Sequence, residues 1–190
     1  MNKQVPVEVS ARHVHLIKED FEKLFGKGKI LTPIKKLSQP GEFASKEIVT
    51  LINRNKKIED VRILGPFRKK SQVEISLTDS YNLKLNPLPS IRVSGDTSGT
   101  VSITVKGPKG NIKIPAIIAQ RHLHCSEKQA KKLNLKNSQI ISVSINGERE
   151  TTFHNIIVRV SKDYDLSMHL DTDEANSAGI KGKTFGNIVK

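Results

Sequence analysis

Two short stretches pair histidines at a spacing that suits metal binding. Four of the six histidines lie in two RHxH motifs, SARHVHL at 10–16 and AQRHLHCS at 119–126. In a β-strand alternate side chains point to one face, so His13 and His15 share a face, and so do His122 and His124. Neutral imidazole is the commonest protein ligand of zinc. Each pair therefore predicts two ligands of a metal site.

The two motifs also agree in what surrounds them. When His13 is placed on His122, which lies 109 positions later, Arg12 falls on Arg121 and Leu24 on Leu133. Each motif then leaves a strand and enters a predicted helix, which favours two related structural halves. The two arginines point away from the histidine face, so we expect them to form salt bridges or helix caps.

A catalytic zinc ion usually has three protein ligands and one open position, so each histidine pair needs a third partner. Glu74 lies on the polar face of a predicted strand, and His169 precedes an acidic helix start. Three further carboxylates could serve as ligands or orient a ligand histidine, although capping of the helix that they precede explains them more simply: Asp171, Asp173 and Glu174. His154 has no nearby ligand partner and is expected to be structural or exposed.

Cys125 directly follows His124, so its side chain points away from the histidine pair in a continuing strand. A packed thiol is therefore expected there, not a ligand. As the only cysteine it allows no intrachain disulfide and fits a reducing compartment. No apolar run approaches the ~18–20 residues of a membrane span, and MNKQVPVEVS enters strand-like sequence without a targeting signal. We expect a soluble, cytoplasmic protein that does not bind membranes.

The chain carries a net charge of +13 from 32 basic and 19 acidic residues. Its lysines occur in scattered pairs, no basic arm gathers them, and few aromatic residues interleave to stack bases. A lysine-rich solvated surface explains this charge first, anionic small substrates second and nucleic acid third. We expect no nucleic-acid partner, and a homo-oligomer is compatible with the sequence.

The chain reads mostly as short strands. Alternating patterns rich in valine, isoleucine and threonine predict strands at QVEISL (72–77), TVSITVKG (100–107) and QIISVSING (139–147). Gly-Pro and Gly-Asn pairs in KGPKGN (106–111) predict a hairpin turn. Helices are predicted at 17–26, at 126–135 behind a Ser126/Gln129 capping box, and at 172–179. Few, short helices among short strands indicate a mainly β protein built of small barrels.

Over essentially its whole length the chain resembles the PduL-type phosphate acyltransferases, also called phosphate propanoyltransferases. The resemblance is carried, in order, by SARHVHL at 10–16, GPFRKKSQVEISLTD at 65–79, RVSGD at 92–96, KGPKG at 106–110, AQRHLHCS at 119–126 and MHLDTDEAN at 168–176. Cysteine at 125 and serine at 71 replace the methionine and threonine common in the family. The amphipathic N-terminal extension of members packaged in microcompartments is not found, which makes a microcompartment lumen the less favoured location.

The resemblance implies a fold and a set of site residues. It implies two β-barrels with short capping helices, one formed by residues 2–12 plus 120–190 and the other by residues 13–119, and two zinc ions held between them. By resemblance the first zinc takes His13, His15 and Glu74, and the second takes His122, His124 and His169. The phosphate-binding arginine of the family falls on Arg68, with Arg92 in the RVSGD turn as the second candidate.

The implied reaction is the exchange of phosphate and coenzyme A on a short acyl group, acetyl or propanoyl. Zinc can polarise the carbonyl or stabilise a thiolate, and a guanidinium can bind phosphate through two parallel hydrogen bonds. The same ligands could also serve a two-zinc thioester or phosphoester hydrolase with water as the nucleophile. A basic β-barrel protein that binds RNA is a further alternative. The acyl chain, the direction of reaction and the residues that contact coenzyme A stay open.

Overall fold

The computed structural model describes residues 3–189, and its chain divides into two compact units. Unit 1 comprises the N-terminal segment up to Ser10, the short segment Ser38–Pro40 and the chain from Gln120 onward. Unit 2 comprises Ala11–Leu37 and Gly41–Ala119. No helix in the described part of the chain has the length and apolar character needed to cross a membrane.

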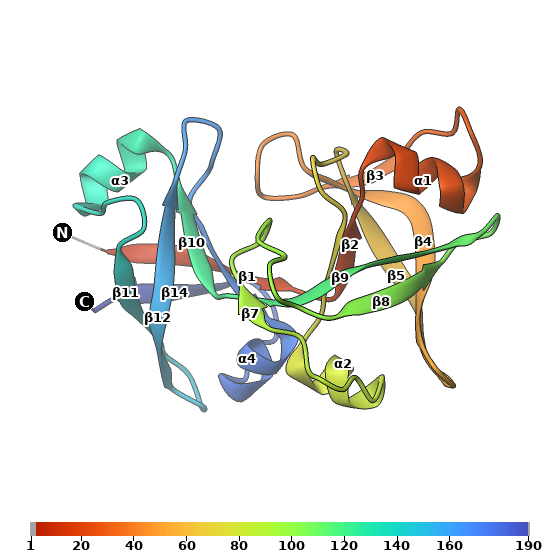
Figure 1. Ribbon diagram of the computed structural model, residues 1–190. Helices are drawn as coiled ribbons and strands as arrows, with labels where there is room; N and C mark the ends of the chain where they lie inside the picture. Colours follow the sequence, from red (N-terminus) through yellow and green to blue (C-terminus); the bar gives the residue numbers. More distant parts are fainter. Residues whose placement is uncertain (1–2, 190) are drawn as a thin grey trace. The chain divides into compact units, whose positions relative to one another are not determined.

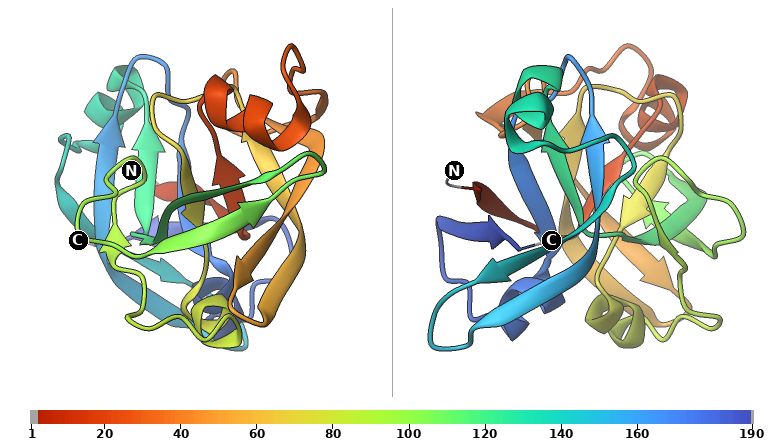
Figure 2. Two further views of the ribbon diagram at one scale, coloured as in Figure 1. Left: turned by 45° about the vertical axis from the view of Figure 1, so that its right-hand side comes forward. Right: turned by 90° about the vertical axis from the view of Figure 1, so that its left-hand side faces the viewer.

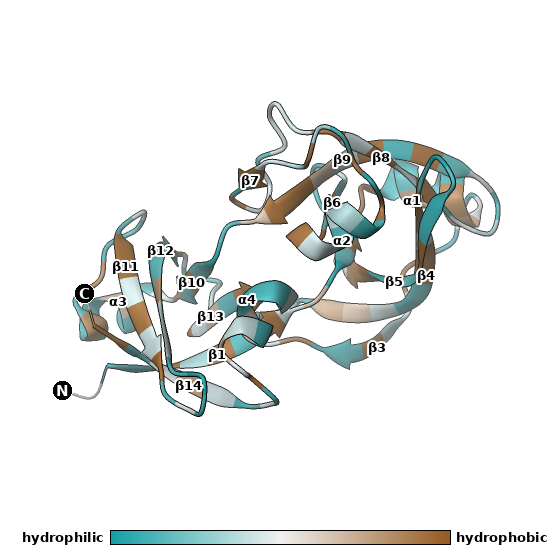
Figure 3. Ribbon diagram, turned by 90° about the horizontal axis from the view of Figure 1, so that it is seen from below, coloured by the Kyte–Doolittle hydropathy of each residue, from teal (hydrophilic) through white to brown (hydrophobic). Residues whose placement is uncertain are grey.

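Unit 1 is a closed β-barrel of six strands (Figure 1). Going around the barrel, the strands are β1 (Gln4–Ser10), β13 (Ser167–Asp171), β10 (His122–Cys125), β12 (Thr151–Val160), β11 (Ile140–Ile145) and β14 (Thr184–Ile188). The chain's first strand thus completes a barrel made otherwise from its last third, with β1 parallel to β13 and antiparallel to β14. Figure 3 shows brown, hydrophobic bands separated by pale bands along β11, and every second residue of this strand is buried, as expected of a strand with one face in a core.

The interior of unit 1 is filled by alternate strand residues. Val5, Val7, Leu123, Met168 and Val158 are all buried in one apolar cluster. Two short helices flank the barrel, α3 (Glu127–Leu133) and α4 (Thr172–Ser177). Both begin at capping boxes, formed by Ser126 with Gln129 and by Asp171 with Glu174. The predicted helices at 126–135 and 172–179 are confirmed, and Asp171 and Glu174 serve as capping residues.

Unit 2 is a second ring of paired strands. Its sheet contains β3 (Pro33–Lys36), β4 (Phe43–Asn53), β5 (Lys56–Gly65), β2 (His13–His15), β6 (Gln72–Glu74), β9 (Asn111–Ala119) and β7 (Ile91–Arg92) in that order, and β8 (Ser102–Lys106) pairs with both β4 and β9. The path through β4, β5, β2, β6, β9 and β8 therefore closes on itself. The prediction of a mainly β protein with two small barrels is confirmed.

Helix α1 (Lys18–Phe25) packs beside β9 in unit 2 (Figure 2). Its residues Phe21 and Leu24 are fully buried. The predicted hairpin of KGPKGN joins β8 to β9 and touches the end of this helix, where Lys109 N donates to Leu24 O at 2.9 Å. A Cβ atom on Gly107 would come within 2.6 Å of the same carbonyl oxygen. Glycine is required at 107 because the hairpin backbone lies directly against the helix terminus.

One expected strand is shorter than its sequence suggested. The pattern QVEISL predicts a strand over 72–77, but β6 ends at Glu74 and helix α2 (Leu77–Asn82) begins three residues later. The cause is local: Ser76 and Asp79 form a reciprocal capping box that starts the helix. Leu77, expected on the buried face of a strand, is 40% exposed at the first position of α2.

The two units repeat one arrangement. In unit 2, β2 is parallel to β5 and antiparallel to β6, with His13 opposite Glu74. In unit 1, β10 is parallel to β12 and antiparallel to β13, with His122 opposite His169. A short capped helix follows the antiparallel neighbour in each case, α2 or α4. The duplication expected from the RHxH motifs is therefore structural, and it pairs Glu74 with His169.

Candidate functional site

The first cluster of chemically active side chains lies in unit 2. His13, His15 and Glu74 are all buried, and each offers one ligand atom within 4.8 Å of the other two. The Nε2 atoms of His13 and His15 are 3.1 Å apart. The Glu74 carboxylate oxygens lie 3.6 Å from His13 Nε2 and 3.7 Å from His15 Nε2. The antiparallel register that sets His13 opposite Glu74 brings the carboxylate to the histidine pair.

A backbone contact sets the tautomer of His13. Its Nδ1 lies 2.8 Å from the carbonyl oxygen of Ala11, which can only accept, so Nδ1 carries a proton and in the neutral ring Nε2 presents a lone pair. That lone pair is directed toward His15 and Glu74. In protein metal sites, a ligand histidine commonly donates a hydrogen bond through the ring nitrogen that does not bind the metal. Two imidazole nitrogens and one carboxylate suit a zinc-like divalent cation.

Glu74 is held by two further polar side chains. Gln72 Nε2 and Ser94 Oγ each donate to Glu74 Oε1 at 2.6 Å. Gln72 is itself fixed, because its Oε1 accepts from Gly95 N at 2.9 Å. Sequence reasoning missed both residues. The position of Gln72 two residues before Glu74 on one strand was a usable signal, since it places both side chains on one face.

The ionisation of this cluster also favours cation binding. Burial lowers the pKa of His15 well below 6.5, and the neighbouring His13 and Arg68 charges lower it further, so its imidazole is neutral at pH 7. For Glu74, burial alone would raise the pKa, but His13 and His15 in their protonated forms, the Ser94 hydrogen bond and Arg68 outweigh it and lower the pKa to about 2. At neutral pH this cluster presents a carboxylate and a neutral imidazole, the protonation states that bind metals.

The second cluster lies in unit 1 and contains three histidines. His122 and His124 on β10 and His169 on β13 each offer a ligand atom within 4.8 Å of the other two. His122 Nδ1 lies 2.8 Å from the carbonyl oxygen of Gln120, which repeats the contact of His13 with Ala11. The His124 ring stacks on Tyr164, with ring centroids 4.2 Å apart. Three imidazoles are a donor set typical of catalytic zinc.

The arginine of each RHxH motif forms an ion pair within its own unit. Arg12 binds Asp79, the third residue of α2, and Arg121 binds Glu174, the third residue of α4. The salt-bridging role expected for both arginines is confirmed. Each pair ties the RHxH motif to the helix that follows the third residue of its cluster.

Arg68 lies beside the first cluster. Its Nη1 is 3.4 Å from Ser94 Oγ, the hydroxyl that donates to Glu74, and its Nη2 binds Glu42 Oε1 at 2.6 Å. Arg92 instead binds backbone oxygens of its own loop, from Ser98 and Ile91. Of the two candidate phosphate-binding arginines, Arg68 is the one linked to the first cluster by hydrogen bonds.

Comparison with known proteins assigns the chain to a family. The chain matches the family described as phosphate propanoyltransferase over residues 6–181. It is 47% identical to the phosphate propanoyltransferase of Thermotoga maritima over 97% of this chain and 88% of that protein. Proteins of the same name from Lachnoclostridium phytofermentans and Clostridioides difficile are 49% and 43% identical, over 97% and 98% of this chain and 85% and 89% of theirs. The chain belongs to the phosphate propanoyltransferase family.

Membership in the phosphate propanoyltransferase family makes the chain an acyltransferase. The two remaining candidate residues, Cys125 and His154, lie outside both clusters. Cys125 is fully buried in the unit 1 core, and burial raises the pKa of its thiol, both of which disfavour a role as nucleophile. His154 is exposed on β12, where its Nδ1 contacts Ser142 Oγ at 2.8 Å.

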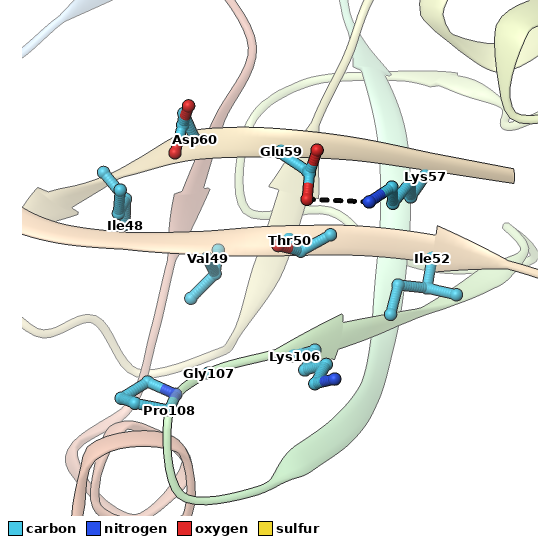
Figure 4. A pocket seen from close by; sticks show the side chains of 10 residues that line it. All are labelled: Ile48, Val49, Thr50, Ile52, Lys57, Glu59, Asp60, Lys106, Gly107 and Pro108. Atoms are coloured by element: carbon cyan, nitrogen blue, oxygen red, sulfur yellow. Dashed lines mark hydrogen bonds and ion pairs between the residues drawn. The ribbon is translucent and has the colours of Figure 1, made fainter.

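A groove on unit 2 lies apart from this chemistry. Strands β4 and β5 and the end of β8 line it, with Ile48, Ile52, Lys106 and the ion pair of Lys57 with Glu59 among its residues (Figure 4). No residue of either cluster lines the groove. Its carboxylates and ammonium groups are those of a solvated strand surface, and it offers no group for acyl transfer.

Proposed function

We propose that the protein is a zinc-dependent phosphate acyltransferase that converts a short-chain acyl-CoA and phosphate reversibly to an acyl phosphate and coenzyme A. Acetyl and propanoyl groups are the proposed acyl chains. The observation that carries the proposal is the pair of three-residue clusters, each with ligand atoms within 4.8 Å, in a chain of the phosphate propanoyltransferase family.

The proposed ligands follow the two clusters. His13, His15 and Glu74 would hold one zinc ion, and the second would be held by His122, His124 and His169. When bound, zinc supplies a Lewis acid that polarises an acyl carbonyl and favours the thiolate over the thiol. Gln72 and Ser94 keep the Glu74 carboxylate oriented, and the backbone carbonyls of Ala11 and Gln120 keep the histidine tautomers set.

Arg68 is the proposed phosphate-binding residue. Its guanidinium has five N–H donors, and Glu42 and Ser94 accept from only two of its nitrogens. Its ion pair with Glu42, itself an anion, supports the proposal that the guanidinium can bind a phosphate. Phosphate would compete with the Glu42 carboxylate for the N–H donors of the Arg68 guanidinium. Arg92 is the second candidate for this role.

In the direction of acyl phosphate formation, a phosphate oxygen forms a bond to the thioester carbonyl carbon and the carbon–sulfur bond breaks. The sulfur leaves as the thiolate of coenzyme A, which takes a proton to give the thiol. The protein's contribution is to hold phosphate on Arg68 and to hold the reacting carbonyl beside it. No acyl-enzyme step is needed, in agreement with the buried state of Cys125.

The decisive experiment measures free thiol released from acetyl-CoA and propanoyl-CoA with and without phosphate. We expect thiol release that requires phosphate, together with formation of an equal amount of acyl phosphate. Thiol release at the same rate without phosphate would instead identify a hydrolase. The sole cysteine leaves no intrachain disulfide, and on that basis we propose a reducing, cytoplasmic compartment. We also propose that the protein has no nucleic-acid partner, because its lysines are scattered, and no membrane partner, because it has no long apolar run.

A further inference from the structure

A carboxylate that sequence reasoning did not single out lies next to the three-histidine cluster. Glu8 is on β1, and the parallel register of β1 with β13 places it opposite His169. Since His169 in turn lies opposite His122 on β10, the three residues form one row across neighbouring strands. Met168 and Leu170 on β13 point into the core, so the row lies on the other face of the sheet.

One contact in this row has the spacing of two metal ligands. Glu8 Oε2 is 3.5 Å from His169 Nε2. Ligands of a tetrahedral zinc with bonds of ~2.0–2.1 Å are about 3.3 Å apart. In the first cluster the separations between Glu74 oxygens and histidine nitrogens are 3.6 and 3.7 Å. The contact between Glu8 and His169 therefore has the length of a ligand–ligand contact.

The Glu8 carboxylate is also held from its outer side. Ser38 Oγ donates a hydrogen bond to the same oxygen, Oε2. Ser38 belongs to the three-residue segment that packs with unit 1, although the chain on both sides of it belongs to unit 2. Buried Gln39 fixes this segment through hydrogen bonds with the Asp165 backbone, donating to its carbonyl oxygen at 3.1 Å and accepting from its N–H at 3.2 Å. Ligating carboxylates are commonly held by such outer hydrogen bonds.

Charge gives a reason for a carboxylate at this position. A divalent cation with two neutral imidazoles and Glu74 has a net charge of about +1, whereas three neutral imidazoles leave about +2. A carboxylate from Glu8 would make the two clusters equal in charge. Glu8 is 46% exposed, so its carboxylate can also be reached by solvent and by an incoming substrate.

We propose that Glu8, held by Ser38, is a fourth ligand of the metal ion bound by His122, His124 and His169 in the substrate-free protein. The proposal rests on the metal sites of the proposed function. It gives the second cluster three nitrogen donors and one oxygen donor, and it assigns a task to the Ser38–Pro40 segment. An anionic substrate that binds to this ion would replace the Glu8 carboxylate.

The test is metal affinity, measured with full-length protein by competition for Zn²⁺ with a chromogenic chelator. Glu8→Gln keeps the size and polarity of the side chain but replaces a carboxylate by a poor ligand. We expect one of two bound zinc equivalents to weaken by at least about tenfold, because even residues that only support a ligand change affinity by 10–100-fold. Ser38→Ala should weaken the same equivalent by a smaller factor.

Two further measurements assign the effect. In a Glu74→Gln background, where the first cluster is impaired, the remaining tight site should show the whole Glu8→Gln loss. With Co²⁺ in place of zinc, Glu8→Gln should change the visible absorption of that site, because a water replaces a carboxylate. The matched control is Glu59→Gln, which removes an exposed carboxylate that pairs with Lys57 and should leave both affinities unchanged.

The outcomes separate this proposal from the proposed function. If the wild type binds two zinc ions and Glu8→Gln alters neither the affinity nor the Co²⁺ spectrum, Glu8 is only an ion-pair neighbour of His169 and the fourth-ligand proposal is wrong. If the wild type binds no metal at the three-histidine cluster, the metal basis of the proposed function fails, and this proposal fails with it.

Discussion

Arg12 and Asp79 form an ion pair with three close contacts. Arg12 Nε lies 2.9 Å from both carboxylate oxygens of Asp79, and Nη2 lies 2.8 Å from Oδ1. The Asp79 side chain is only 1% exposed and also accepts from Ser76 N in the capping box of α2. The pair therefore joins the residue before His13 to the helix that follows Glu74, and it braces the strands that carry the first cluster.

Asp79→Ala is expected to lower the free energy of unfolding by about 1.5–3 kcal/mol, the usual value for a hydrogen bond to a charged group. Arg12 keeps 43% exposure and can be hydrated, so the loss should stay below the 3–5 kcal/mol typical of breaking a fully buried pair. Urea denaturation followed by circular dichroism measures the change.

Removal of the exposed pair of Lys57 with Glu59 provides the control for this prediction. Both side chains are more than half exposed, so Glu59→Ala should cost less than about 1 kcal/mol. The double variant Arg12→Ala/Asp79→Ala then isolates the coupling between the two residues. A coupling near zero would contradict the bracing role of the pair.

Metal content is the second prediction. Protein purified without added metal should contain close to two zinc equivalents per chain by elemental analysis, one for each cluster. Because the ions bind the folded chain, a strong chelator should lower the melting temperature. His13→Ala and His122→Ala should each remove one equivalent, whereas His154→Ala, the exposed control, should remove none. A single equivalent in the wild type would contradict the assignment of two sites.

Part of this site could be predicted from local sequence, because its geometry is local. Strand periodicity places His13 with His15 and His122 with His124 on common faces, and the turn and capping patterns predict α3, α4 and the 106–111 hairpin. Glu74 and His169 are candidate third ligands from the sequence, but only the family resemblance assigns each of them to its cluster. The pairings of His13 with Glu74 and His122 with His169 are cross-strand registers that no local pattern encodes.

The residues that were missed depend on contacts between distant segments. Ser94 reaches Glu74 from a loop 20 residues away, and Ser38 reaches Glu8 from a segment whose neighbours belong to the other unit. In the sequence, Glu8 is one polar residue of an alternating apolar and polar strand pattern, and nothing local marks it as a ligand. Helix α2 was not predicted, because QVEISL fits a strand pattern. The capping box of Ser76 and Asp79, which starts the helix, spans only four residues and is a weaker signal.

The third prediction concerns Cys125. Its side chain is fully buried in the unit 1 core, and burial raises the pKa of its thiol, so it is a poor nucleophile at neutral pH. Cys125→Ala should keep most of the activity and lose about 1 kcal/mol of stability through the deleted buried atom. Native protein should react slowly with a thiol reagent. Loss of activity beyond about a thousandfold, with folding and zinc content intact, would show instead that the thiol takes part in the chemistry.

The last prediction concerns Arg68, whose guanidinium lies between Glu42 and the Ser94 hydroxyl. If it binds phosphate, Arg68→Ala removes a charge-assisted contact of about 1.5–3 kcal/mol, and turnover at a fixed subsaturating phosphate concentration should fall at least about ten- to hundredfold. Arg68→Lys should restore only part of the rate, because the charge returns without the two-pronged geometry. Thiol release at saturating acyl-CoA across a phosphate titration measures both variants.

Two controls show whether the effect belongs to phosphate. Zinc content should be unchanged in both Arg68 variants, because Arg68 contacts Ser94 and Glu42 and is not itself a proposed ligand. Arg92→Ala tests the second candidate, whose side chain is bound to its own loop through Ser98 O and Ile91 O, and it should have a much smaller effect. If Arg68→Ala follows the wild-type phosphate curve while Arg92→Ala shifts it, the phosphate site lies at Arg92, and the contact of Arg68 with Glu42 is structural.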